Sequence, residues 1–164
     1  MKINTLKIII YCFASILIIF SCNNKNSSSK GGLTDLLKYG IPYSIKAPSD
    51  VAITKIGKGE LSDVSIKNNS GYDLQIFMGS ASTSDLKRII DSKKNIVITN
   101  PSFSKIVEEY DDGFLFEKTN DEGNRTYDFV IVKIIGPNEI NFQSGNSKEF
   151  TESDVKKMVA SIRN

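Results

Sequence analysis

Two regions of the chain alternate between apolar and polar residues with the period of two that is typical of half-buried strands. The first region predicts four short strands in an antiparallel meander, at residues 43–47, 52–56, 63–67 and 72–78. The second region begins after Pro101 and predicts four more, at residues 104–110, 114–118, 127–135 and 139–143. The breaks in this second region carry Asp, Asn, Gly or Pro, which favour turns.

The stretch between these regions has the period of a helix instead. Leu86, Ile89 and Ile90 fall at positions i, i+3 and i+4, so one side of a helix is apolar. We predict roughly three helical turns that begin after Ser82 or Ser84 as the N-cap and end near residue 95. Asp85 favours the positive end of the helix dipole.

A second helix is predicted at the end of the chain. Thr151-Glu152-Ser153-Asp154 resembles a capping box with Asp in the usual place of Glu, and Phe150 is placed to contact Val155 as a hydrophobic staple. One stripe of this helix is apolar and consists of Val155, Met158, Val159 and Ile162. We expect the stripe to pack on the sheet; a partner or ligand surface is the alternative.

The strand at 127–135 is apolar on both faces. Phe129, Ile131 and Ile135 point to one side, and Val130, Val132 and Ile134 point to the other. Such a strand is typical of the interior of a sheet that is covered on both sides. The two predicted helices are the available covers, unless a second layer of sheet takes one face.

The N-terminal segment does not follow either pattern. Lys2 and Lys7 precede or flank an apolar run from Ile8 to Phe20, which has the length of a signal-peptide core. It is shorter than the roughly 20 residues that a membrane-spanning helix needs. We therefore predict a signal peptide at residues 1–21, with an uncleaved N-terminal anchor as the alternative.

Ile19-Phe20-Ser21-Cys22 resembles the lipobox of bacterial lipoproteins. The resemblance implies cleavage before Cys22 and a diacylglycerol on its sulfur; a plain secretory signal cleaved elsewhere is the alternative. The residues that follow Cys22, as far as residue 32, are polar Asn, Ser, Lys and Gly. Residues 22–32 therefore predict a flexible tether that holds the domain on the order of 20 Å from the lipid surface on average. Residues 33–164 then form one predicted α+β domain.

Composition narrows the chemistry that this domain can perform. The chain has no histidine, and its two cysteines are Cys12, in the leader, and Cys22. Histidine-based triads, thiolate catalysis and internal disulfides are therefore excluded from the mature domain. The whole chain has 21 basic and 19 acidic residues, and loss of Lys2 and Lys7 with the leader balances the two. Balanced charge predicts no nucleic-acid partner, and we predict no cofactor.

Acidic residues concentrate around two turns of the second strand region. Glu108 and Glu109 are adjacent on a strand and should point to opposite faces. We interpret the other acidic residues as parts of solvated turns, since Asp favours turns on conformational grounds. The alternative is a metal or catalytic site, for which the candidates are Asp111, Asp112, Asp121 and Glu122.

The order of several segments resembles a known fold family. These segments are the opening residues 43–48, the helix with Leu86, the strand residues 129–132, and the closing helix 155–162 with its Ser161. Over residues 39–164 they resemble the PsbP/Mog-like fold. The resemblance implies an α+β fold of the αβα sandwich type, with an antiparallel sheet covered by helices, and a function in binding other proteins. No functional residues carry over, because the matching positions are core positions.

Three functions are consistent with these observations. The first is a non-enzymatic lipoprotein of the bacterial cell envelope, on the periplasmic face or the cell surface, that holds a binding or accessory domain for a protein or envelope partner. The second is a hydrolase or metal-dependent enzyme that uses carboxylates among Glu108, Glu109, Asp112 and Asp121. The third is a carrier of a small ligand or lipid, which requires an enclosed apolar pocket between sheet and helix.

Overall fold

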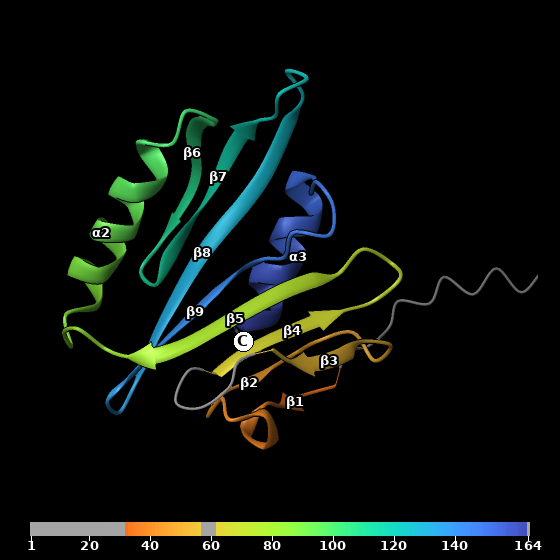
Figure 1. Ribbon diagram of the computed structural model, residues 1–164, viewed down its shortest axis with the longest axis vertical. Helices are drawn as coiled ribbons and strands as arrows, with labels where there is room; N and C mark the ends of the chain where they lie inside the picture. The colour runs from red at the N-terminus through yellow and green to blue at the C-terminus, as the bar shows by residue number, and fades with distance from the viewer. Residues whose placement is uncertain (1–31, 57–61, 164) are drawn as a thin grey trace, which may run out of the picture.

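The computed structural model describes residues 32–56 and 62–163 (Figure 1). The predicted signal peptide, Cys22 and the tether as far as residue 31 lie outside the described residues. Among the segments that are described, no helix combines the length and the apolar character that crossing a bilayer requires.

Seven strands form one antiparallel sheet in the order β3-β4-β5-β9-β8-β7-β6. They are β3 (Ala52–Lys55), β4 (Ser62–Lys67), β5 (Asp73–Ser80), β6 (Phe103–Tyr110), β7 (Gly113–Thr119), β8 (Arg125–Ile135) and β9 (Asn138–Ser144). The first meander, β3 to β5, is confirmed, and each of the four strands expected after Pro101 is present. The last strand, β9, returns beside β5, so the two regions make a single sheet.

The expected first strand of the meander, residues 43–47, is wrong as a member of this sheet. Its core, β2 (Ser44–Ile45), pairs instead with β1 (Thr34–Asp35) in a separate two-stranded sheet. The alternation there reflects packing on the C-terminal helix, because Ile45 is fully buried and the Tyr43 hydroxyl donates to the carbonyl of Ile162 at 2.8 Å. Between β1 and β2 the chain makes a short 3-10 helix, η1 (Leu37–Tyr39).

The two predicted helices are confirmed, and they cover opposite faces of the sheet. Helix α2 (Leu86–Ile98) buries Ile89 and Ile90 against Phe114, Phe116 and Val132. Helix α3 (Glu152–Ile162) buries its predicted stripe in the larger core, together with Phe129 and Ile131. Strand β8 is therefore covered on both faces, as its two apolar sides predict. The result is an α+β fold built on a large antiparallel sheet (Figure 1).

The helix starts differ in how well their caps were predicted. The capping box of α3 is confirmed, since the side chains of Thr151 and Asp154 each accept a hydrogen bond from the other residue's backbone. For α2 the N-cap is Asp85 and not Ser82 or Ser84: its carboxylate accepts from the Arg88 amide at 3.1 Å. Asp can fill this position as well as Ser, so local sequence does not decide among neighbouring caps.

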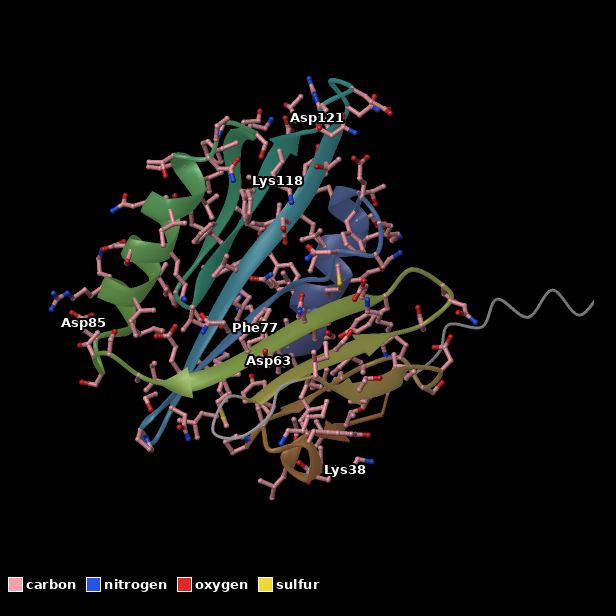
Figure 2. The ribbon with its side chains drawn as sticks, viewed as in Figure 1. Lys38, Asp63, Phe77, Asp85, Lys118 and Asp121 are labelled. Carbon is pink, nitrogen blue, oxygen red and sulfur yellow. The ribbon has the colours of Figure 1, made fainter. Side chains whose placement is uncertain are left out.

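Helix α2 covers only part of its face of the sheet. Beyond β8, that face continues over β9, β5, β4 and β3, where a cross-strand row of polar side chains runs through Gln143, Gln75, Ser65 and Thr54. The next row pairs Asn141 with Phe77 and Phe77 with Asp63. Figure 2 shows Phe77 and Asp63 on β5 and β4, away from α2. The sheet is thus apolar where α2 lies on it and mainly polar elsewhere on this face.

Candidate functional site

A polar cleft of about 480 Å³ lies between the β7–β8 turn and the loop that joins β9 to α3. This volume is in the range of small-molecule sites in proteins. We take it as the candidate site because separate segments of the chain converge on it. The polar cleft is lined by Ser102, Lys118, Thr119, Asn120, Asp121, Thr126, Tyr127, Asp128, Ser144, Gly145, Asn146, Lys148, Glu149 and Phe150.

Asn120 holds one wall of the polar cleft. Its side-chain oxygen accepts from the amides of Glu122 (3.1 Å) and Asn124 (2.7 Å), which closes the β7–β8 turn. Its side-chain nitrogen donates to Glu149 at 2.6 Å in the loop before α3. One asparagine therefore shapes the turn and ties it to the opposite wall.

Asp73 stabilises the opposite wall of the polar cleft, which is the loop between β9 and α3. This buried carboxylate at the start of β5 accepts from the backbone and hydroxyl of Ser147, and lies 3.3 Å from the Lys67 ammonium. Gly145 passes so close that a Cβ there would lie about 2.0 Å from the Asp73 carboxylate. The close approach requires glycine and fixes the path of the β9–α3 loop.

The floor of the polar cleft carries an ion pair between Lys118 on β7 and Asp128 on β8. The Lys118 ammonium lies 2.9 Å from one Asp128 oxygen. The other oxygen accepts from the amide of Phe129 (2.8 Å) and from the hydroxyl and amide of Ser144. Both oxygens of Asp128 are therefore engaged, by donors from Lys118, Phe129 and Ser144. Lys118 itself stays about one-third exposed (35%) and uses one of its three N–H donors on Asp128.

A small recess of about 180 Å³ adjoins the polar cleft beneath the C-terminal end of α2. The two hollows share Ser102, Lys118 and Asp128, and the recess adds the apolar side chains Ile96, Val97, Phe103 and Phe116. Its volume is below the roughly 300 Å³ of ordinary ligand pockets. Nearer the middle of α2, Ile89, Ile90 and Phe114 fill the space between helix and sheet.

The four carboxylates proposed for catalysis do not share one cleft. Glu108 lies 3.6 Å from Lys156 of α3, and Glu109 lies 2.6 Å from Lys94 of α2, so the prediction that they point to opposite faces is confirmed. Of the four, only Asp121 lines the polar cleft.

Asp112 corrects the interpretation of the first turn as solvated. Asp111 is exposed, but Asp112 is buried, with oxygens 2.7 Å from the Lys133 ammonium and 2.9 Å from the Arg163 guanidinium. Arg163 also stacks over the Tyr110 ring at 4.4 Å. Asp112 therefore joins the β6–β7 turn to β8 and to the end of α3, and two cations occupy its oxygens.

The second acidic turn is exposed as predicted, with both Asp121 and Glu122 at the surface. Within residues 32–56 and 62–163, no group of three or more Asp, Glu, His or Cys side chains is arranged to hold a metal ion.

Another buried polar cluster near this end of the sheet is centred on Glu117, which sequence reasoning missed. Its carboxylate accepts from the Ser104 hydroxyl (3.0 Å) and the Tyr127 hydroxyl (3.2 Å), with Lys105 at 3.5 Å and Arg125 at 3.8 Å. Burial raises the pKa of Glu117, but the two hydroxyls and two cations outweigh burial, so its pKa is lowered. A charged residue directly after the apolar run Phe114–Phe116, inside a predicted strand, is the signal that could have found Glu117, as Asp128 is for β8.

Comparison with protein-family models, with curated proteins and with solved structures gave no match.

Proposed function

We propose that this chain is a lipoprotein of the bacterial cell envelope, anchored through a lipid on Cys22, whose folded part is a non-enzymatic binding domain. The observation that carries the anchor is the leader: two lysines, an apolar run and Ile19-Phe20-Ser21-Cys22 in succession. The localisation follows from the anchor, on the periplasmic face or the cell surface. The relationship to the PsbP/Mog-like fold is part of this proposal, supported by the order of elements and by a helix on each face of an antiparallel sheet.

The polar cleft is the proposed binding site for a protein or envelope partner. It offers hydroxyl and amide groups from Ser102, Thr119, Asn120 and Asn146, and an ammonium from Lys118. Such groups bind a ligand rich in hydrogen-bonding groups. Asp128 and Glu149, two carboxylates of the polar cleft, already hold Lys118 and Asn120. With these two carboxylates engaged inside the protein, the hydroxyl, amide and ammonium groups are left to contact a ligand, which supports a binding role.

The anchor is tested by labelling cells with radioactive palmitate. The expected result is label in the wild-type protein and none in the Cys22→Ala variant. Unlabelled wild-type protein would contradict the anchor.

The binding site is tested by photo-crosslinking in intact envelopes. A photoreactive amino acid at Asn146, which is exposed at the polar cleft, should give a discrete crosslinked product. The same group at Ser92, exposed on α2, is the matched control. Lys118→Ala combined with Asn120→Ala should reduce the product from position 146 at least fivefold. Equal amounts of crosslinked product from positions 146 and 92 would contradict a partner in the polar cleft. An unchanged amount of product from position 146 in the double variant would contradict it as well.

A further inference from the structure

Two large apolar side chains are exposed where the described chain begins. Leu33 and Leu37 keep 71% and 63% of their surface, whereas Leu36 between them is completely buried. Leu36 belongs to the main core with β2 and α3. The segment is therefore held firmly on the protein by one leucine while two others face outward.

An aromatic ring and a cation accompany the exposed leucines. Lys38 is exposed, and its ammonium lies 4.9 Å from the centre of the half-buried Tyr39 ring. The turn that presents them begins where the Asp35 carboxylate accepts from the Leu37 amide at 2.9 Å. We call Leu33, Leu37, Lys38 and Tyr39 the leucine patch. Apolar side chains beside tyrosine and lysine are the residues that settle at a membrane interface, because each combines an apolar body with a polar tip or neighbour.

The leucine patch also lies at the end of the molecule that the anchor holds. Residue 33 follows Cys22 by eleven positions. At about 3.3–3.6 Å per residue, the intervening chain spans at most about 40 Å in any conformation. Figure 1 shows β1 and η1 at one extremity of the molecule and the β7–β8 turn at the other. Among the described elements, β1 and η1 are thus the first that a lipid on Cys22 brings to the bilayer.

We infer that the leucine patch rests on the phospholipid surface and orients the domain, with Leu33 and Leu37 among the headgroups and Lys38 beside anionic lipid. The inference rests on the proposed lipid anchor at Cys22. The anchor supplies the attachment, so the contribution of the patch is orientation. With η1 on the lipid, the polar cleft at the opposite end faces away from the membrane, where a partner can reach it.

Hydrogen exchange on the full acylated protein tests this orientation. The protein is reconstituted into vesicles of phosphatidylethanolamine and phosphatidylglycerol at three to one, and compared with the same protein in detergent. Amides in peptides covering residues 33–40 should exchange at least threefold more slowly on vesicles. Peptides covering 119–124, at the β7–β8 turn, should exchange equally in both. Leu33→Ser with Leu37→Ser should abolish the slowing, and Lys38→Glu should weaken it by about half.

The matched control is Ile96→Ser with Ile98→Ser, which removes two other exposed apolar side chains, 69% and 44% exposed, from the end of α2. This control should leave the slowing unchanged. An acylated wild type without slowing, or slowing that survives the double leucine substitution, would overturn the inference while the anchor stands. If amide exchange at residues 33–40 instead slows in detergent as the protein concentration rises, the leucine patch binds a second copy of this chain. That result would also overturn the inference. The mass of the same sample reports the acyl group; its absence would overturn the anchor and the inference together.

Discussion

The two faces of the sheet are made by the same strands, yet they are covered to very different extents. On one face, α3 and the β1–η1–β2 segment enclose a single core that reaches from β4 to β7. On the other, α2 covers a smaller cluster on β6, β7 and β8, and the rest of the face is mainly polar. The α3 face therefore buries most of the apolar surface and carries most of the stability. The partly covered face leaves room at its border for the polar cleft and its recess.

The largest expected difference comes from one substitution made on each face of β8. Ile131 is completely buried on the α3 face, and Ile134 is half-buried on the α2 face. Ile131→Ala should cost about 3–5 kcal/mol, from lost burial and the cavity left behind. Ile134→Ala should cost about 1–2 kcal/mol, since less surface is buried there. Urea unfolding at pH 7 measures the free energy of unfolding of both variants. Equal losses would show that the two faces contribute equally to stability.

A smaller difference is expected between two ion pairs. Asp112 lies on the α3 side with its side chain 9% exposed, and its removal leaves Lys133 and Arg163 without their carboxylate. Because both cations keep some contact with water, Asp112→Asn should cost about 1.5–3 kcal/mol, less than the loss of a fully buried ion pair. Glu109 pairs with Lys94 on the α2 side, but its side chain is 64% exposed. Glu109→Gln should cost less than about 1 kcal/mol. If Glu109→Gln lost more stability than Asp112→Asn in the same unfolding assay, the ion pair on the α2 side would be the more stabilising one.

The smallest expected effect depends on pH. Burial acts to raise the pKa of Glu117, but Ser104, Tyr127 and the neighbouring cations lower it overall. The pKa of an unfolded Glu is about 4.3. A carboxyl whose pKa is lower than this in the folded protein contributes its full stabilisation above the unfolded pKa. The contribution disappears as the pH falls through the folded pKa.

Glu117→Gln should therefore be less stable than the wild type at pH 7, and the gap should close between about pH 5 and pH 3. Glu109→Gln is the control on the opposite face. Unfolding curves at pH 7, 5 and 3 measure the gap for each variant. A gap for Glu117→Gln that is constant over this range would show that its hydrogen-bond geometry, and not its charge, stabilises the fold.

Local patterns predicted most elements of this fold. The strand at 127–135 and the capping box at Thr151 were both located from the sequence, because side-chain period and capping depend on neighbouring residues. The pairing of β5 with β9 was not located, since it joins Leu74 to Ser144 across most of the domain. The prediction that residues 43–47 join the meander was wrong for the same reason. Their alternation shows that one side is buried, but it does not indicate which strand they pair with.

The candidate site was harder to predict than the fold. Asp121 was recognised as part of a turn, but nothing near it in the sequence indicates that Glu149 and Asn120 would close a cleft around it. Asp112 has the sequence signature of an ordinary turn, and only Lys133 and Arg163, from two other elements, make it a buried ion-pair residue.

Sequence alone was sufficient for what depends on neighbouring residues or on composition: the N-terminal pattern that predicts lipid on Cys22, the periods of strands and helices, and the absence of histidine from the chain and of cysteine after residue 22. Tertiary structure decided which strands pair, which face stays polar, and which carboxylates meet cations. The physical reason is that period and capping are set within a few residues. Burial and charge pairing depend on side chains that only the folded backbone brings within a few ångströms of one another.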